Sequence, residues 1–149
     1  MKTILVPVDF SDATAGITRE AVRLARAFAA NIVMVHIAAP EPEFVGYDAG
    51  PPSVRSAVAR DLAEEHRRLH ELTTSLDGQG VQVTALVFQG YPVEKILAEA
   101  EKWDVDLIVM GSHGHGILHN LLVGSVTDGV LRRATCPVLV VPVRPPSAS

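Results

Sequence analysis

Three glycines and a serine at fixed spacing are the residues of this chain best suited to chemistry. They are Gly111, Gly114, Gly124 and Ser125, within the stretch MGSHGHGILHNLLVGSVT that covers residues 110–127. The stretch follows an apolar, strand-like run and leads into a predicted helix. Glycines placed in this way let the backbone approach a ligand closely, and N–H groups at a helix N-terminus bind phosphate. The spacing therefore predicts a nucleotide site, with an ordinary surface turn as the alternative explanation.

Histidines in the same loop raise a second alternative, a metal site. His113, His115 and His119 fall within the seven residues HGHGILH, and imidazole is a common zinc ligand. No cysteine or carboxylate nearby completes a ligand set. A divalent ion bridged by phosphates is therefore favoured over zinc held by protein alone. His36, at the end of a predicted strand, is interpreted as a structural histidine.

The elements that must position the loop alternate between short apolar runs and amphipathic segments. The predicted strands are Thr3–Val8, Ile32–Ile37, Val81–Phe88, Val105–Met110 and Pro137–Val143. Four helices are predicted. The first follows a cap at Ser11 or Asp12, the second follows a cap at Ser53, the third begins at Pro92, and the fourth spans Ser125–Ala134. Five strands alternating with four helices predict βαβ units, a parallel sheet and helices on both of its faces.

Local signals refine this outline. Residues 38–52 are rich in proline, glycine and glutamate and predict a long surface loop. The alternating pattern of Val81–Phe88 places that strand nearer an edge of the sheet. The long helix after Ser53 is expected to bury one stripe, formed by Val54, Val58, Leu62, Leu69, Leu72 and Leu76. We expect one domain over residues 1–143 and a frayed tail over residues 144–149.

Two features lie at the carboxyl ends of predicted strands, where doubly wound sheets bind their ligands. Asp9 follows the first strand and Gly111 follows the fourth. If these strands are neighbours, the carboxylate and the glycine loop face each other across one crevice. That arrangement would suit a ribose at Asp9 and phosphates at the loop.

Composition limits the function classes. The 149 residues are 48% apolar and 20% charged, and the formal net charge is −4, which disfavours a protein that coats nucleic acid. The single cysteine, Cys136, excludes an intrachain disulfide. No apolar run approaches the ~20 residues of a membrane span, and no signal peptide is visible. We therefore expect a cytoplasmic protein without nucleic-acid or membrane partners.

The chain resembles the universal stress protein family over essentially its whole length. The resemblance is carried by ILVPVDFSD near the start and by VDLIVMGSHGHG and LLVGSVTDGVLRRATCPVLVV near the end. The family's nucleotide-binding signature, G-x2-G-x9-G-[S/T], is met in full by Gly111, Gly114, Gly124 and Ser125. The resemblance implies a doubly wound, five-stranded parallel sheet of order 3-2-1-4-5. It also implies a homodimer paired through the last strand, and ATP or AMP between strands one and four. The divalent ion bridged by phosphates would then be Mg²⁺, which could supply positive charge.

Site residues are carried over from the family by position. Asp9 would accept hydrogen bonds from the ribose hydroxyls. The residues implied to surround the base are Pro7, Val8, Val35 and Met110. The residues implied to lie along the ribose and the phosphates are Gly111, His113, Gly114, His115, Gly124, Ser125, Val126 and Thr127. One position departs from the family pattern, because many members carry arginine where this chain has His115.

Catalysis finds less support than binding. The loop lacks the form G-x4-G-K-[S/T], no lysine occurs after Lys102, and the loop itself contains no arginine. Phosphoryl transfer normally uses such positive charge. We therefore expect a dimeric regulatory or sensing module that binds an adenine nucleotide, with a dimer surface, or a surface for an unidentified protein partner, that depends on the nucleotide. The alternatives are a slow ATPase, and a dimeric interaction protein with a vestigial nucleotide site.

The last predicted strand gives the dimer some independent support. PVLVVPV would lie at an edge of a sheet of this order, and a bare apolar edge invites pairing with another chain. Pro142 removes one hydrogen-bond donor, so the pairing is expected to be short.

Overall fold

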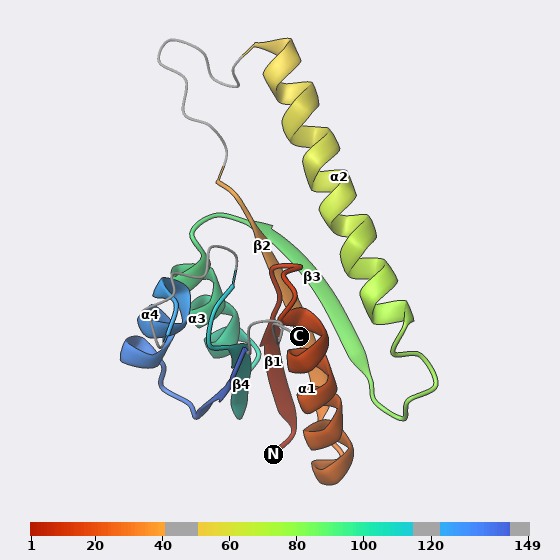
Figure 1. The fold of residues 1–149 in the computed structure, drawn as a ribbon, viewed down its shortest axis with the longest axis vertical. Coiled ribbons are helices and arrows are strands. Elements are labelled where there is room, and N and C mark those ends of the chain that lie inside the picture. Colours follow the sequence, from red (N-terminus) through yellow and green to blue (C-terminus); the bar gives the residue numbers. More distant parts are fainter. Residues whose placement is uncertain (41–50, 115–122, 144–149) are drawn as a thin grey trace, which may run out of the picture.

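The structure, a computed structural model, describes residues 1–40, 51–114 and 123–143. Strands and helices alternate along the described chain, as the apolar periodicity predicts (Figure 1). The elements are β1 (Thr3–Pro7), α1 (Thr14–Phe28), β2 (Asn31–Ala38), α2 (Pro52–Thr74), β3 (Val83–Gln89), α3 (Pro92–Lys102), β4 (Leu107–Gly111), α4 (Ser125–Arg133) and β5 (Val138–Val141).

The five strands form one parallel sheet in the order β3-β2-β1-β4-β5. This order confirms the expected 3-2-1-4-5 arrangement, including the edge position of β3. The central strand β1 pairs with β2, ending at Pro7 opposite Val35, and with β4, where Leu5 lies opposite Ile108. From β1 the chain adds β2 and β3 on one side, and it then adds β4 and β5 on the other side of β1. The strand order therefore reverses between the neighbours β1 and β4, which is where such sheets open a crevice.

Alternate side chains of the strands supply two cores, one on each face of the sheet. Ile4 and Val6 of β1 pack with Ile17 of α1 in the core beneath α1 and α2. Leu5 of the same strand packs with Ile96 in the core beneath α3 and α4. All five side chains are at most 4% exposed. Burying an aliphatic side chain of this size stabilises a fold by roughly 1.5–3 kcal/mol, so both layers hold β1 in place.

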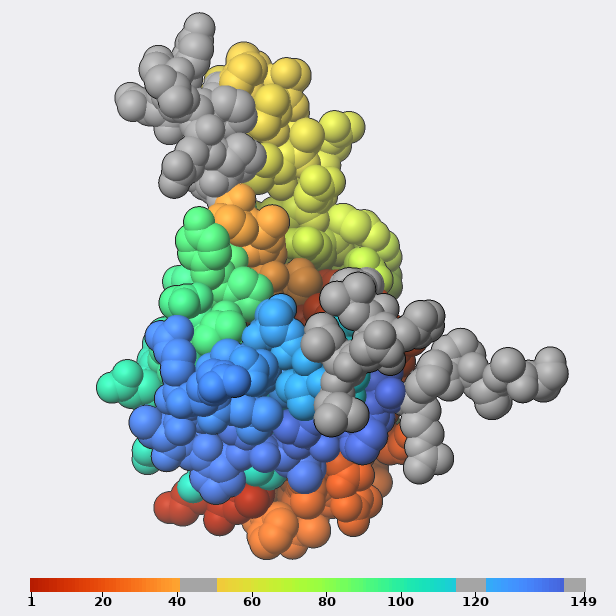
Figure 2. Space-filling model, turned by 60° about the vertical axis from the view of Figure 1, so that its left-hand side comes forward, coloured from red at the N-terminus to blue at the C-terminus, as the bar shows by residue number. Residues whose placement is uncertain are grey.

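Helix α2 packs on the sheet over only part of its length. Its C-terminal half contacts β2 and β3, whereas its N-terminal part extends beyond the end of the sheet (Figures 1 and 2). Of the predicted stripe only Leu69 and Leu76 are buried, and Leu76 lies after the helix ends at Thr74. The other four apolar positions are half-buried. The expectation of one continuous buried stripe is therefore wrong.

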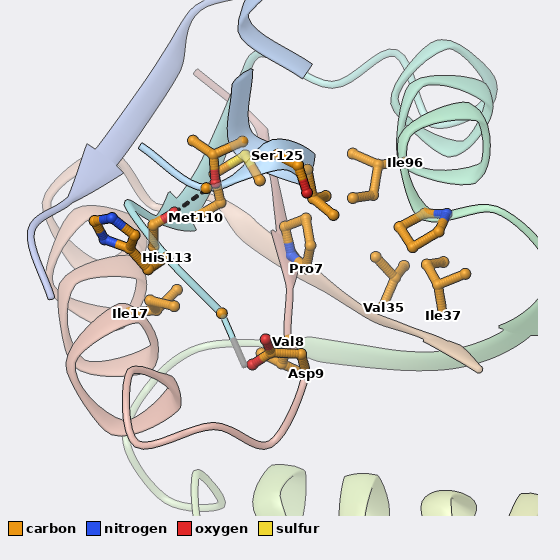
Figure 3. A pocket seen from close by; sticks show the side chains of 16 residues that line it. Pro7, Val8, Asp9, Ile17, Val35, Ile37, Ile96, Met110, His113 and Ser125 are labelled. Atoms are coloured by element: carbon orange, nitrogen blue, oxygen red, sulfur yellow. Dashed lines mark hydrogen bonds between the residues drawn. The ribbon is translucent and has the colours of Figure 1, made fainter. Parts of the chain in front are cut away.

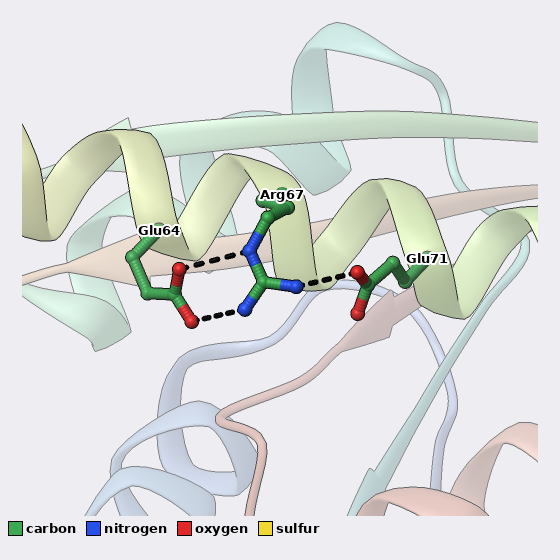
Figure 4. Close-up of polar contacts among 3 residues, drawn as sticks. All are labelled: Glu64, Arg67 and Glu71. Atoms are coloured by element: carbon green, nitrogen blue, oxygen red, sulfur yellow. Dashed lines mark hydrogen bonds and ion pairs between the residues drawn. The ribbon is translucent and has the colours of Figure 1, made fainter.

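The exposed side of α2 carries ion pairs between neighbouring turns. Arg67 bonds Glu64 one turn before it and Glu71 one turn after it (Figure 4). All three side chains are more than half exposed. Exposed pairs of this kind contribute little to stability, because water screens the charges and two long side chains must be held in one geometry. The apolar residues on the opposite side of α2 therefore account for its packing on the sheet.

Two predicted helix caps are wrong. Helix α1 begins after Ala13 with no side-chain cap. The backbone N–H of Ser11 donates to Asp9 Oδ1 at 3.0 Å and the carbonyl of Ser11 accepts the N–H of Thr14 at 3.0 Å, so Ser11 lies in the turn before the helix. Helix α2 begins at Pro52, so Ser53 lies inside its first turn. Proline at the first position has no N–H to satisfy, which reduces the need for a cap.

Other boundaries differ by a few residues. Helix α4 ends at Arg133, and β5 covers only Val138–Val141 of the predicted Pro137–Val143. The predicted loop overlaps β2 at Ala38 and α2 at Pro52, and its residues 41–50 lie outside the described residues, as does the predicted tail over residues 144–149. None of the described helices is long and apolar enough to cross a membrane.

Asp106 ties the start of the chain to the sheet in a way that pH should reveal. Its Oδ2 accepts the backbone N–H groups of Lys2 and Thr3 at 2.6 and 2.9 Å, and these bonds lower the pKa of the carboxyl from its ordinary value. Because the pKa is lowered in the folded state, the carboxylate stabilises the fold at pH values above its unfolded-state pKa, which is about 4. This stabilisation is lost as the pH falls through the folded-state pKa. We expect Asp106→Asn to be less stable than the parent at neutral pH and equal to it in strong acid. Urea unfolding across this pH range measures the difference, and parallel stability curves for the two proteins would contradict the expectation.

Candidate functional site

A pocket of about 430 Å³ opens at the carboxyl ends of the central strands (Figure 3). Its walls come from the ends of β1, β2 and β4 and from the N-terminal parts of α1, α3 and α4. The residues that line it are Pro7, Val8, Asp9, Ile17, Val35, Ile37, Pro92, Ile96, Met110, Gly111, His113, Gly114, Gly124, Ser125, Val126 and Thr127. The crevice therefore lies between β1 and β4, where the neighbouring strand ends place Asp9 and Gly111 together.

The pocket brings together every predicted site residue that the structure describes. His115 lies outside the described residues, as does His119. Four apolar lining residues were not predicted: Ile17, Ile37, Pro92 and Ile96. Three of them fit the apolar pattern of the hydrophobic core, and Pro92 fits the start of a helix. The sequence pattern therefore could not distinguish residues that line the pocket from residues that are only buried. One signal was available in the sequence. Ile37 lies just before a predicted loop and Pro92 lies shortly after a glycine, and both places are at the same end of the sheet as Asp9.

One side of the pocket is apolar. Figure 3 shows Val35 and Ile37 of β2 gathered with Ile96 of α3, opposite His113 on the other side. Val35 and Met110 are 0% and 4% exposed, so they belong to the packed layer and present only part of their surface to the cavity. A flat apolar ligand group is suited to this side, because it would be desolvated without leaving side-chain polar groups unpaired.

The main chain supplies polar groups on the apolar side. Strand β1 pairs with β2 as far as Val35, and the N–H of Val8 donates to the carbonyl of Val35 at 2.8 Å. Strand β2 then continues to Ala38 in pairing with β3. Because alternate residues of a strand direct their N–H and C=O to opposite neighbours, Ile37 directs both groups to the side that β1 has vacated. One donor and one acceptor thus face the pocket at this position.

Asp9 lies at the corner where the chain leaves β1. Its Oδ1 accepts the N–H of Ser11 at 3.0 Å, which fixes the carboxylate in a local turn. Its Oδ2 lies against Gly114, so closely that a Cβ built on that glycine would be 2.1 Å from the oxygen. The absence of a side chain at Gly114 is therefore what allows the carboxylate to occupy its position beside the loop.

The first turn of α4 forms the wall opposite Asp9. Gly124 is the N-cap and carries no side chain that could bond the first N–H groups of the nine-residue helix. These groups and the positive end of the helix dipole favour a negatively charged ligand. Ser125 begins the helix at the pocket. The hydroxyl of Thr127 donates to the carbonyl of Gly111 at 2.7 Å, so its hydrogen is already committed to holding α4 against the end of β4.

Ser112 joins three elements at the back of the loop. Its N–H donates to the carbonyl of Val141 at 2.9 Å, and its carbonyl accepts the N–H of Gly124 at 2.6 Å. Its hydroxyl oxygen accepts the N–H of Val143 at 3.0 Å and lies 3.0 Å from Nδ1 of His113. The end of β4, the region after β5 and the start of α4 are therefore connected through one buried residue, 8% exposed.

The described lining of the pocket carries few ionisable side chains. Among the described lining residues, Asp9 and His113 are ionisable and none is lysine or arginine. No group of three metal-ligating side chains occurs within residues 1–40, 51–114 and 123–143. The three-histidine zinc alternative involves His115 and His119 and so falls outside the described residues.

Comparison with known proteins gives one consistent result. The model of the universal stress protein family matches residues 1–142. A Thermus aquaticus universal stress protein is 36% identical over 140 residues, covering 94% of this chain and 98% of that protein. The solved structure of Methanocaldococcus jannaschii MJ0577 has a TM-score of 0.80 and 29% identity, with 97% of each chain covered. The fold is also shared with an Archaeoglobus fulgidus universal stress protein in complex with dAMP, which has a TM-score of 0.67 and 22% identity and covers 94% of this chain and 97% of that one.

Proposed function

The chain belongs to the universal stress protein family, and on that premise we propose that its pocket binds an adenine nucleotide, ATP or AMP. The proposal rests on one observation: Asp9 and two glycines of the signature, Gly114 and Gly124, line the same cavity. The dAMP complex of the Archaeoglobus fulgidus protein shows that this fold accommodates an adenine nucleotide in a relative.

Each part of the nucleotide has a counterpart in the pocket. The phosphates would meet the main-chain N–H groups at the start of α4, where Gly124 leaves the helix end open. The ribose hydroxyls would donate to the carboxylate of Asp9, which also accepts from Ser11. The base would lie on the apolar side against Val35 and Ile96. A Mg²⁺ ion carried by the phosphates would supply the positive charge that the described lining residues lack.

The main chain of Ile37 supports a preference for adenine. An N–H and a C=O directed into the same space complement the acceptor N1 and the donor amino group of adenine. Guanine presents the reverse arrangement along that edge and would leave both main-chain groups facing groups of their own kind. The proposed selectivity thus comes from backbone geometry on β2.

We infer a regulatory or sensing role in the cytoplasm, as a homodimer paired through β5, and not catalysis. Strand β5 lies at the edge of the sheet and its residues Val138–Val141 are only half-buried. The exposed Leu131 of α4, at 45%, adds apolar surface from the helix that precedes this edge. A second copy would cover this edge, and Ser112 would connect it to the nucleotide loop. Slow ATP hydrolysis is the enzymatic alternative.

The first test is the nucleotide that the protein carries or rebinds. Purified protein is denatured and its small molecules are separated by ion exchange, and the emptied protein is titrated with ATP, AMP and GMP. We expect stoichiometric adenine nucleotide or tight rebinding. We also expect AMP to bind roughly 30-fold or more tightly than GMP, because two mismatched main-chain groups cost about 1–3 kcal/mol each.

The same preparation separates the alternatives. Neither carry-over nor binding at millimolar ATP would contradict the proposal and favour an interaction protein with a vestigial site. Equal affinity for AMP and GMP would leave a nucleotide site but remove the role of Ile37. A time course of phosphate release under saturating ATP and Mg²⁺ is expected to stay flat, and release that is lost in Ser125→Ala would favour the ATPase.

A further inference from the structure

The chain turns sharply at the residue that follows Asp9. Phe10 has φ of 59°, in the left-handed region that residues with side chains rarely adopt. Such a conformation persists only where surrounding contacts impose it, and it occurs preferentially at functional sites. The position of the Asp9 carboxylate therefore depends on what holds the two residues on either side of it.

Both of those residues are held by His36 of β2. The imidazole is 6% exposed, and its Nδ1 lies 2.8 Å from the carbonyl oxygen of Val8, so Nδ1 donates to the residue before Asp9. The same ring packs on the residue after Asp9, because the ring centroids of His36 and Phe10 are 4.4 Å apart with a tilt of 36°. One buried side chain thus contacts the residue before Asp9 and the residue after it.

Helix α2 contacts the same corner from the outside. The guanidinium of Arg68 lies over the ring of Phe10, 4.4 Å from the ring centroid, within the range of a cation–π interaction. Glu65, one helical turn earlier, has Oε1 3.5 Å from Nε2 of His36. That nitrogen makes no hydrogen bond within the described residues. Arg68, Phe10 and His36 therefore form a stack from the surface of α2 to the end of β1.

We propose that His36 is a positioning residue for Asp9, and that α2 contributes to this positioning through Arg68. Ribose recognition and the packing of α2 are then coupled, since the same stack serves both. The inference rests on the proposed adenine-nucleotide site and adds a route by which that site changes a second surface. Coupling is reciprocal, so a nucleotide that engages Asp9 stabilises α2 on the sheet, and loosening α2 weakens ribose binding.

Ribose discrimination tests the positioning role. The affinity of the emptied protein is measured for AMP and for 2′,3′-dideoxy-AMP, which lacks both hydroxyls that Asp9 would accept. We expect the parent protein to prefer AMP by roughly 10- to 100-fold, the value of a hydrogen bond to a charged group. His36→Phe should bring the ratio close to one. His36→Asn should retain most of it, because the asparagine amide can still donate to the carbonyl of Val8.

Variants on α2 test the coupling without touching the pocket. Arg68→Gln is expected to lower the AMP preference about two- to fivefold, the value of a cation–π contact at an exposed site. Arg67→Gln is the matched control, because Arg67 bonds Glu64 and Glu71 on its own helix and should leave the ratio unchanged. Hydrogen exchange of residues 62–74 should slow with AMP and not with the dideoxy analogue.

The outcomes separate this inference from the proposed function. If the parent binds AMP with ribose preference and both His36→Phe and Arg68→Gln keep the parent ratio, only the positioning role is overturned. A merely structural His36 would weaken both nucleotides equally and give that result. If the parent binds neither nucleotide, the proposed function itself fails and the positioning role with it.

Discussion

Gly124→Asp is expected to abolish nucleotide binding while leaving the fold intact. The residue is the N-cap of α4 and lines the pocket, so a carboxylate there would occupy the space of the phosphates with like charge. A Cβ at this position meets its nearest atoms, the Cα of His113 and the carbonyl of Ser112, at 3.4 Å, an ordinary contact. Aspartate is also a preferred N-cap. We expect an unfolding temperature equal to or above that of the parent, and a loss in ATP affinity of about 100-fold or more, since each charge-assisted bond contributes about 1.5–3 kcal/mol.

The matched control is Gly124→Asn, which has nearly the same shape and caps a helix equally well but carries no charge. It should retain much more affinity than the aspartate variant. Calorimetric titration with ATP and thermal unfolding of both variants provide the two readouts. Parent-like affinity in Gly124→Asp would mean that the phosphates lie elsewhere, and the assignment of the α4 N-terminus would be wrong.

The second large effect is expected from Gly114→Ala. The added Cβ would lie 2.1 Å from Oδ2 of Asp9, far inside contact distance, so the carboxylate must rotate away. The backbone of Gly114 lies outside the left-handed region, and the obstructing atom is the end of a side chain, so the fold can accommodate the change. We expect AMP affinity to fall roughly 10- to 100-fold, as for a lost hydrogen bond to a charged group, with little change in the free energy of unfolding.

Gly16→Ala is the control for the substitution type. Gly16 lies inside α1, and its added Cβ would be 4.0 Å from the nearest atom, the end of Arg19. Alanine in a helix interior is more favourable than glycine by roughly 0.5–1 kcal/mol, so stability should rise and affinity should not change. A Gly114→Ala protein that binds AMP as tightly as the parent would show that ribose recognition does not depend on Asp9.

The sheet could be predicted from the sequence because buried parallel strands have a distinctive pattern. The predicted Ile32–Ile37 differs from the observed Asn31–Ala38 by one residue at each end, since the apolar run coincides with the part of β2 covered on both faces. Strand order came from the family resemblance, because periodicity contains no information about which strands are neighbours. The glycines were recognisable from their spacing, and Asp9 from its place after the first predicted strand and from the family resemblance.

Features that depend on tertiary contacts could not be predicted. Ser53 has the chemistry of a cap, but α2 begins at the preceding proline. Ile96 lines the pocket with the same spacing that a purely buried helix position would have. The half-buried stripe of α2 reflects how far the helix extends past the sheet, which no local pattern encodes. His36 was interpreted as a structural histidine, and only its contacts with Val8 and Phe10 indicate a more specific role.

The bonds of Ser112 have a consequence for how the protein matures during its synthesis. Its N–H and its hydroxyl oxygen find their partners at Val141 and Val143, the last residues to leave the ribosome among those that build the site. Until β5 docks, the loop that joins β4 to α4 lacks these two restraints. A nascent chain that has made β1 to β4 and α4 but not β5 has therefore produced the lining residues of the pocket without these two bonds. If the proposed nucleotide site is correct, ligand binding is therefore expected to be complete only after β5 has docked.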